Sequence, residues 1–236
     1  MRLCQIILYT YWIFYSIISL ESILEMGCFF LMKTVITIGR QFGSGGREIG
    51  EKLAAHFGIK FYDKEILTEA AKESGICEEM IKIHDERPTS SFLYNLVMDT
   101  YSFGYNASTI SDMPISHKVF LAQFDSIKKF ADEGPCVIVG RCADYALKDY
   151  ENCINIFIHA DEDTRINRIM EKHNISSQKA KEMIQKKDKQ RQSYYNYYSS
   201  NKWGRSDTYD LSIDSSVLGI DGTVEMLIHF IEKFDK

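Results

Sequence analysis

The sequence predicts an α/β protein with one parallel β-sheet and helices on both of its faces. Short apolar, β-branched runs alternate with longer helical patterns along the chain, which is typical of a parallel sheet. A chain of 236 residues is long enough to bury the core of one such domain. Gly, Asp and Arg follow the expected strands, and ligands of such folds bind at the carboxyl ends of strands.

The first part of the chain is expected to form two strands and three helices. In order, these are a strand at residues 35–38, a helix that ends at Gly58, a strand at residues 60–62, and helices at residues 65–72 and 78–84. The first helix presents Ile49, Leu53 and Ala54 on one face. Gly58 is a good residue for the end of a helix because it adopts a left-handed backbone readily.

The second part is expected to form three further strands. In order, its elements are a helix at residues 116–131, strands at 136–139 and 154–159, a helix capped by Asp161, a long polar helix from Ser176, a strand at 211–213 and an amphipathic helix at 222–234. Residues 87–114 lack clear periodicity and are interpreted as a partly helical, mobile insert.

The N-terminal segment, residues 1–31, is unusually apolar. Residues 3–20 carry no charged side chain and approach the length of a membrane span. A secretory signal is a second interpretation, although Arg2 is a weak basic region and no small-residue cleavage site follows. We favour a third interpretation, in which translation begins at Met32, because the predicted domain starts directly after it. The protein would then be cytoplasmic, and it would contact a membrane only if residues 1–31 are a genuine anchor.

Composition narrows the class of protein. Apolar residues make up 45% of the chain and charged residues 26%, which argues against wholesale disorder. The net charge of −5 argues against nucleic-acid binding driven by bulk charge. Six scattered cysteines form no C-x-x-C pair, so reduced and mostly buried thiols are expected rather than a metal site. No feature of the sequence predicts the number of subunits.

A glycine-rich loop joins the first strand to the first helix. Its residues are Gly43, Ser44, Gly45 and Gly46. Such a loop at a helix start lets backbone N–H groups approach phosphate oxygens. The usual phosphate-loop pattern is G-x-x-x-x-G-K-[ST], whereas here Arg47 and Glu48 follow the glycines. A tight turn that only needs the backbone freedom of glycine is the alternative.

Several ordered motifs resemble the cytidylate kinase-like branch of the P-loop nucleoside monophosphate kinases. The resemblance rests on ITIGRQFGSGGREIG, FYDKEI, CVIVGRCADY, INIFIHADEDTRINRIM and KKDKQR…YYNYY followed by WG, and it extends from Met32 to the C-terminus. It implies a P-loop NTPase fold, a three-layer sandwich around a five-stranded parallel sheet. It also implies a helical lid at about residues 174–205 and places the insert of residues 87–114 beside the monophosphate. The implied activity is phosphoryl transfer from ATP, with Mg²⁺, to a nucleoside monophosphate, CMP or dCMP foremost.

The resemblance implies that the glycine-rich loop wraps the phosphates of ATP. Ordinary cytidylate kinases have the P-loop lysine where Gly46 stands and a Thr where Glu48 stands. Arg47 is therefore a candidate replacement cation, or else a surface arginine at a helix start. Glu48 could ligate Mg²⁺ as a carboxylate, or it could only complement the helix dipole.

On the acceptor side, the resemblance implies roles for Asp63, Arg141, Asp144 and Gln123. Asp63 would orient the acceptor or hold Mg²⁺ through water, and its alternative is an N-cap for the following helix. Arg141 matches the Arg of the Gly-Arg-Asp motif that binds cytidylate. Cys142 replaces the Asp of that motif, so Asp144 would have to serve. Gln123 could read the base with its amide, although a solvated helix face is the alternative that we favour.

Two further groups of cations are candidates. In related kinases, arginines at the places of Arg165 and Arg168 contact ATP or the transferring phosphate; the alternative is a solvated face paired with Glu162 or Glu171. Lys187 and Arg191 lie in the lid-like segment and would close over the phosphates, although a charged run is usually a solvated helix. The tyrosines of the same segment could pack the lid against the body, stack on a base or form a subunit contact, and these are Tyr194, Tyr195, Tyr197 and Tyr198.

The chemistry suits these residue types. An acceptor phosphate is largely ionised near neutral pH and needs no strong general base. Catalysis then consists of positioning and of neutralising charge on the moving phosphoryl group. A kinase for another small phosphoryl acceptor is one alternative. A nucleotide-binding regulator without catalysis is another, since the Lys and Thr of the usual loop are missing.

Overall fold

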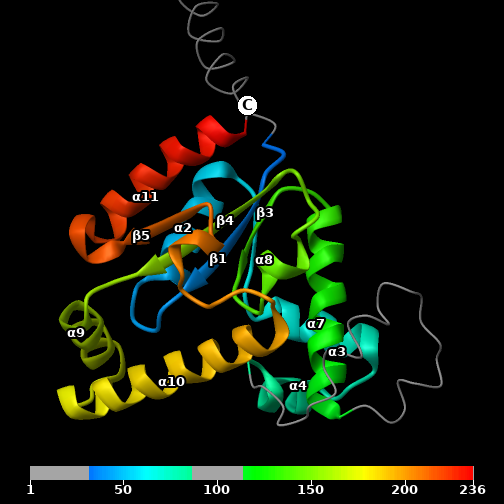
Figure 1. Ribbon diagram of the computed structural model, residues 1–236, viewed down its shortest axis with the longest axis horizontal. Helices are drawn as coiled ribbons and strands as arrows, with labels where there is room; N and C mark the ends of the chain where they lie inside the picture. Colours follow the sequence, from blue (N-terminus) through cyan, green and yellow to red (C-terminus); the bar gives the residue numbers. More distant parts are fainter. Residues whose placement is uncertain (1–31, 87–113, 236) are drawn as a thin grey trace, which may run out of the picture. The chain divides into compact units, whose positions relative to one another are not determined.

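The computed structural model of the protein describes residues 32–86 and 114–235. From Thr34 onward the chain forms one compact unit. Its five strands form a fully parallel sheet in the order β2-β3-β1-β4-β5, which confirms the predicted sheet (Figure 1). The strands are β1 (Val35–Arg40), β2 (Lys60–Tyr62), β3 (Cys136–Val139), β4 (Cys153–His159) and β5 (Leu211–Asp214).

Helices cover both faces of the sheet, as predicted. On one face lie α2 (Gly46–Phe57) and α11 (Ser215–Phe234), which pack against each other. On the other face α7 (Ile115–Asp132) and α8 (Ala143–Ala146) contact the strands, and α3 (Glu65–Ser74) and α4 (Glu78–His84) pack on α7. Beyond β4, α9 (Glu162–His173) packs against the long helix α10 (Ser177–Tyr198), which crosses the lower part of Figure 1. A short 3₁₀ turn at Ser206–Thr208 precedes β5.

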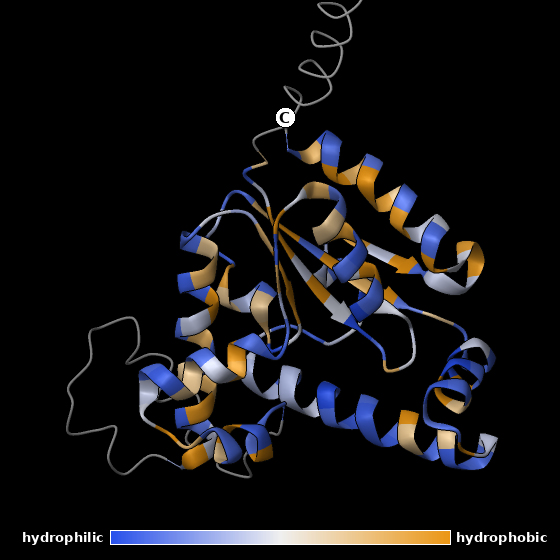
Figure 2. Cartoon of the chain, turned by 180° about the vertical axis from the view of Figure 1, so that it is seen from behind, coloured by the Kyte–Doolittle hydropathy of each residue, from blue (hydrophilic) through white to orange (hydrophobic). Residues whose placement is uncertain are grey.

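The core follows from the apolar strands. Ile36, Ile38, Ile138 and Ile156 are almost completely buried, because a parallel sheet with helices on both faces hides both sides of each strand. Figure 2 shows the strands largely in apolar colours and α10 mostly in polar ones. Helix α10 buries only five of its residues, three of them tyrosines at its C-terminal end, in keeping with the polar helix expected from its sequence.

Several elements differ from the prediction, most by one or two residues and three in ways that matter for the site or the fold. β1 continues to Arg40, so this arginine belongs to the strand and not to the glycine-rich loop. The four-residue helix α8 was not expected, because one turn has no detectable periodicity. The last helix begins at Ser215 and is interrupted at Gly219, which has a φ of 69°.

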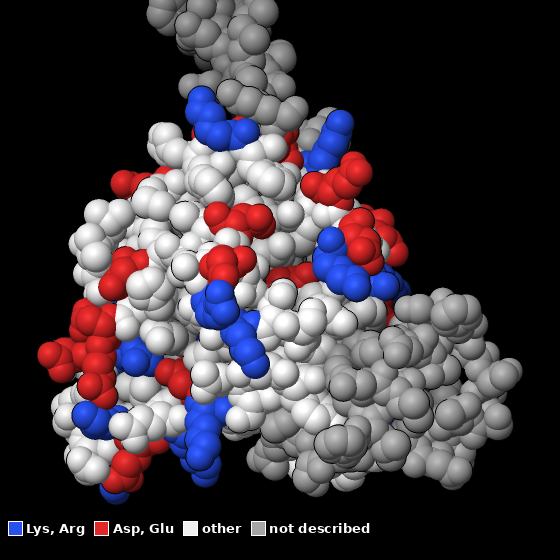
Figure 3. Space-filling model, viewed as in Figure 1, with Lys and Arg blue, Asp and Glu red and all other residues white. Residues whose placement is uncertain are grey.

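Predictions for residues 1–31 and 87–113 lie outside the described residues. No helix among the described residues is long and apolar enough to cross a membrane. Within the same residues Cys136, Cys142 and Cys153 are buried free thiols, whereas Cys77 is exposed. Acidic and basic side chains are interspersed over the face drawn in Figure 3, in keeping with the mildly negative net charge.

Candidate active site

The glycine-rich loop turns sharply between β1 and α2. Gly43 and Gly45 have φ values of 83° and 81°, a left-handed backbone that glycine adopts without strain. A Cβ on Gly43 would lie 3.1 Å from the carbonyl oxygen of Arg165, and a Cβ on Gly45 would lie 3.1 Å from Ile220. The loop is therefore packed closely between α9 and α11, and no side chain caps α2. A helix start of this kind favours phosphate binding.

Side chains on neighbouring elements hold this loop in place. The Ser44 side chain is buried, and its hydroxyl donates to the Gln41 carbonyl at 2.9 Å. Arg168 donates to the Gly43 carbonyl at 3.4 Å and to the Ser215 hydroxyl at 3.1 Å. The Ser215 hydroxyl in turn donates to the Ser44 carbonyl. These hydrogen bonds hold the loop in one conformation without a bound ligand. The Ser44 hydroxyl is one of the groups that stabilise this conformation.

Arg165 connects the loop to α10. Its guanidinium donates to the Phe42 carbonyl at 3.4 Å and forms an ion pair with Asp188 at 2.6 Å. The other Asp188 oxygen accepts the backbone N–H of Phe42 at 2.7 Å. The alternative in which Arg165 and Arg168 pair with Glu162 or Glu171 is therefore wrong for the described residues. Arg165 donates to the carbonyl just before the glycine-rich loop and Arg168 to a carbonyl within it, so both arginines face this loop.

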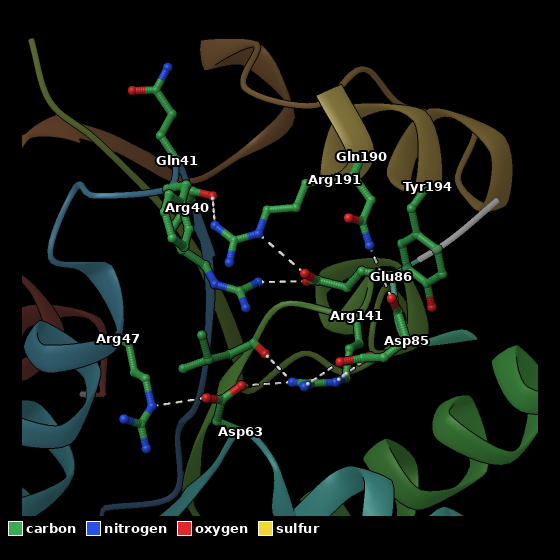
Figure 4. Close-up of polar contacts among 12 residues, drawn as sticks. Arg40, Gln41, Arg47, Asp63, Asp85, Glu86, Arg141, Gln190, Arg191 and Tyr194 are labelled. Carbon is green, nitrogen blue, oxygen red and sulfur yellow. Dashed lines mark hydrogen bonds and ion pairs between the residues drawn. The ribbon is translucent and has the colours of Figure 1, made fainter. Parts of the chain in front are cut away.

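Arg141 lies at the carboxyl end of β3 and is 4% exposed. It donates to Asp63 Oδ1 at 2.8 Å, to the two carboxylate oxygens of Asp85 at 3.0 Å each, and to the Val139 carbonyl at 3.1 Å (Figure 4). Arg141 and Cys142 both have a left-handed backbone, with φ values of 54° and 56°. This conformation costs a non-glycine residue about 1–2 kcal/mol, and such strain is typical of functional sites.

Asp63 lies between two guanidinium groups. Its second oxygen accepts Arg47 Nε at 2.9 Å, so one carboxylate joins Arg47 to Arg141. Burial would raise the pKa of Asp63, but the nearby positive charges, Arg141 first, hold it below its usual value. The N-cap alternative is wrong: Lys64 occupies that position in α3, with no side-chain cap. The carboxylate serves the arginine cluster instead.

A second set of charges lies beside the first, and of its three members Arg191 was named from the sequence, whereas Arg40 and Glu86 were missed. Glu86 accepts Arg40 Nη1 at 2.9 Å and Arg191 Nε at 3.2 Å, and Arg191 also donates to the Arg40 carbonyl at 3.3 Å. Burial opposes the ionised form of Glu86, yet Arg40, Arg191 and Arg141 outweigh it and lower its pKa. Like Arg141, Arg40 is a charged residue at the end of a buried strand, and this feature could have identified it from the sequence. Glu86 has no comparable feature in the sequence.

These residues surround one cavity of about 570 Å³. This is the size range of small-molecule sites in proteins. Its lining combines cations with carboxylates, as expected for a strongly charged ligand. Its charged lining residues include Arg40, Asp63, Asp85, Glu86, Arg141, Lys187 and Arg191.

Gln123 and Asp144 lie behind this cluster. Gln123 is 1% exposed, donates to Asp85 at 3.1 Å and accepts the Tyr194 hydroxyl at 3.1 Å, so the solvated-face alternative is wrong. Asp144 accepts a hydrogen bond from the Tyr195 hydroxyl. Burial raises the pKa of Asp144 to about 6, against the opposing effect of the Tyr195 hydrogen bond. Asp144 also lines a smaller cavity next to Arg141.

Three of the four tyrosines at the end of α10 are buried, which settles most of their role. Tyr194, Tyr195 and Tyr198 belong to one apolar cluster with residues of α7 and β4. Tyr198 is fully buried and stacks on Phe120 with 3.9 Å between ring centres. These side chains pack α10 against the body of the domain.

In the part of the chain that the structure describes, neither of the proposed metal ligands, Glu48 and Asp63, belongs to a group of side chains placed to hold a metal ion. Glu48 is 54% exposed and lies 3.6 Å from Lys52, and Asp63 is paired with arginines. Among the described residues, no group of three or more His, Cys, Asp or Glu side chains is placed to hold a metal ion. Arg47 is half exposed and pairs with Glu51 at 3.0 Å as well as with Asp63. The metal assignment stays a proposal, and it requires these pairs to open.

The chain is similar in sequence or in fold to several known proteins. The chain is 25% identical over 209 residues to a cytidylate kinase from Methanopyrus kandleri, covering 84% of this chain and 93% of that protein. It is 27% identical over 206 residues to a cytidylate kinase from Pyrococcus horikoshii, covering 86% and 91%. The crystal structure of an uncharacterized protein from Eubacterium ventriosum superposes with a TM-score of 0.64 at 33% identity, covering 85% of this chain and 99% of that one.

More distant structures share the fold alone. Shikimate kinase from Bacteroides thetaiotaomicron superposes with a TM-score of 0.50 at 12% identity, covering 85% of this chain and 99% of that one. The sequence model of the cytidylate kinase-like family matches residues 35–217, most of the domain described above. The chain therefore belongs to the cytidylate kinase-like family.

Proposed function

We propose that this protein transfers the γ-phosphoryl group of ATP to a nucleoside monophosphate, with CMP or dCMP as the acceptor. Membership of the family makes the protein a phosphotransferase. The observation that carries the finer proposal is the buried Arg141, which holds both oxygens of a carboxylate in the wall of a large cavity. A guanidinium binds phosphate through the same paired geometry.

In this proposal the acceptor phosphate takes the place of Asp85 on Arg141. Asp85 and a phosphate oxygen pair would compete for the same two N–H donors, those on Nε and Nη2. Asp63 would keep its bond to Nη1 and so hold the guanidinium plane while the partner changes. Asp63 is thus proposed to position the acceptor through Arg141.

The phosphates of ATP would lie against the glycine-rich loop at the start of α2. Backbone N–H groups there supply the donors. Arg165 and Arg168 already bond to carbonyls of this loop, which directs their charge to the same place. Lys187 and Arg191 of α10 line the cavity and would neutralise the transferring group.

The reaction does not require strong acid–base catalysis by the protein. An oxygen of the acceptor phosphate forms a bond to the γ-phosphorus, the bond from that phosphorus to the bridging oxygen breaks, and ADP leaves with the electron pair. The acceptor is largely ionised at pH 7, so no general base is required. When bound with ATP, Mg²⁺ supplies further neutralisation of phosphate charge.

The choice of base is supported by the resemblance and by the two relatives named cytidylate kinases. One observation favours a different small acceptor as a second candidate. Gln123, the proposed base reader, is fully engaged by Asp85 and Tyr194, and Cys142 stands where the family motif has Asp. The location that accompanies the first proposal is the cytoplasm, where its substrates occur.

The test is a coupled assay of ADP release from ATP with CMP, dCMP, UMP, AMP and hydroxyl-bearing small molecules, with and without Mg²⁺. We expect turnover with CMP or dCMP. Turnover only with another acceptor would support the second candidate, and ATP binding without turnover on any acceptor would support a regulator.

Arg141→Ala tests the acceptor site itself. We expect CMP binding to weaken by at least 100-fold, because two charged hydrogen bonds of about 1.5–3 kcal/mol each are lost, while ATP binding is retained. Lys60→Ala is the control, since Lys60 is exposed and pairs with Glu133 at 2.8 Å at the opposite end of the sheet. Loss of ATP binding with CMP binding kept would show that the acceptor site has been misplaced.

A further inference from the structure

The resemblance to cytidylate kinases places Gly46 where those kinases have the P-loop lysine, and the structure leaves no room there for a side chain. A Cβ on Gly46 would lie 2.7 Å from Arg40 Cβ and 3.3 Å from Arg40 Cγ. Contacts shorter than 3.0 Å do not occur for real Cβ atoms. The stem of Arg40 thus fills the space that a lysine at residue 46 would need.

A second glycine makes room for the other end of the same side chain. A Cβ on Gly140 would lie 1.8 Å from Arg40 Nη1 and 2.7 Å from Arg40 Cζ. Gly140 follows β3, whereas Gly46 begins α2, so the two glycines come from separate parts of the chain. Both must lack a side chain for Arg40 to lie as it does.

The path of Arg40 leads into the charged cavity. Its side chain is 10% exposed, and its guanidinium meets Glu86 at 2.9 Å in the cavity wall. Figure 4 shows Arg40 and Arg191 pointing toward the same Glu86 carboxylate, with Arg141 beside them. A guanidinium this deeply buried is costly unless an anion pairs with it. The single carboxylate of Glu86 serves both Arg40 and Arg191.

We propose that Arg40 is a catalytic residue that supplies, from the end of β1, the positive charge that a P-loop lysine supplies from the start of the helix. The proposal rests on the proposed kinase function and names a further residue for it. In the transfer of the γ-phosphoryl group from the bridging oxygen to the acceptor oxygen, Arg40 would donate N–H bonds to the phosphate oxygens that gain charge. The phosphate group would displace Glu86 from Arg40.

Arg47 is the competing candidate, because it directly follows the glycines. It is half exposed, forms ion pairs with Glu51 on its own helix and with Asp63 on the acceptor side, and lies over the ring of Phe61. Arg40 instead lies against Gly46 itself and points into the cavity. Replacing Arg40 and replacing Arg47 should therefore have different effects on activity.

The experiment compares Arg40→Gln, Arg40→Lys, Arg47→Gln and the control Lys60→Gln, using calorimetric titration of ATP and steady-state kinetics. We expect Arg40→Gln to lower kcat by about 10²- to 10³-fold, as loss of one charge-stabilising donor does in other enzymes. Arg40→Lys should keep more activity, Arg47→Gln should lose less, and Lys60→Gln should match the wild type. Equal losses in Arg40→Gln and Arg40→Lys would point to a packing role and overturn the proposal. So would a larger loss in Arg47→Gln.

A matched glycine pair guards against a variant that merely fails to fold. Gly140→Ala would push the Arg40 guanidinium aside, whereas Gly75→Ala introduces the same side chain into open space at a similar φ, 68° against 77°. Both variants carry similar backbone strain, but Gly140→Ala should melt at a lower temperature because its Cβ also displaces Arg40 from Glu86. A melting temperature above that of the assay shows that the variant is folded. We expect kcat to fall at least tenfold in Gly140→Ala only, and equal activity in both would overturn the proposal.

The two proposals fail separately. If the wild type binds ATP, Arg40→Gln weakens that binding tenfold or more and no monophosphate is phosphorylated, the role of Arg40 in phosphate binding stands and the proposed activity falls. If the wild type phosphorylates CMP and Arg40→Gln does so within threefold, the activity stands and the role of Arg40 falls. A wild type that binds no ATP overturns both.

Discussion

Replacing Asp85 by Asn should tighten the binding of the acceptor, although it removes an ion pair. Asp85 holds the Arg141 guanidinium through two bonds of 3.0 Å. In the proposed reaction a phosphate takes these donors, so Asp85 competes with the substrate. Asn keeps one acceptor oxygen but has no charge, which weakens the competitor without leaving Arg141 unpaired, since Asp63 remains at 2.8 Å.

The size of the effect follows from these contacts. A hydrogen bond between charged groups contributes about 1.5–3 kcal/mol, and Asn loses one such bond outright. The Asp85 side chain is 21% exposed, which places the effect at the lower end of that range. Because 1.4 kcal/mol corresponds to tenfold in affinity, we expect the Kd for CMP to fall about tenfold.

Calorimetric titration of CMP into the wild type and Asp85→Asn measures this directly. Asp207→Asn is the matched control, because Asp207 also pairs with an arginine, Arg205, but is 62% exposed in a short turn. Its Kd for CMP should equal that of the wild type. Weaker CMP binding by Asp85→Asn would refute the reasoning and would mean that Asp85 holds Arg141 in the orientation that the substrate needs.

Two further predictions concern stability. The Asp144 pKa is about 6 in the fold against an ordinary 3.8, so the folded state binds more protons than the unfolded state between these values and stability falls as pH rises from about 4 to 6. At 1.36 kcal/mol per pKa unit, the loss of stability reaches about 3 kcal/mol. Urea unfolding at pH 4.5 and 7.5 should show a smaller change in the free energy of unfolding for Asp144→Asn than for the wild type. An equal change in both proteins would contradict the assignment to Asp144. Tyr198→Ala should lower the free energy of unfolding by about 3–5 kcal/mol, because the ring is fully buried and stacked on Phe120. The same measurement on Tyr197→Ala, whose ring is only partly buried, should give a smaller loss.

The fold could be predicted closely from the sequence because its signals are local. The bounds of β2 and β3 match the prediction, since each is a short apolar run between turn residues. Asp161 caps α9 through the Thr164 N–H, as its position before a helical pattern predicted. The kink at Gly219 was not predicted, because a single glycine within an apolar pattern does not reveal where the helix bends.

The site was predicted only in part because its partners are distant in sequence. Arg141 was identified from its place at a strand end, yet its partner Asp85 lies 56 residues away. Glu86 binds Arg191 across 105 residues. Arg40 was overlooked because the P-loop pattern directs attention to the residues after the last glycine. Such contacts are created by the packing of α4, α7 and α10 and leave no local pattern.

The tyrosine anchor of α10 has a mechanical consequence. One end of this helix is buried in the body of the domain through Tyr194, Tyr195 and Tyr198, while Ala180 and Ile184 near its start belong to a cluster with residues of α9 and with Phe42. Asp188, between the two ends, accepts the backbone N–H of Phe42, the residue before the glycine-rich loop. Movement of α10 about its tyrosine end would therefore have to break the hydrogen bond from Phe42 to Asp188 and the ion pairs Arg165–Asp188 and Arg191–Glu86. These contacts join the position of the helix to the shape of the glycine-rich loop.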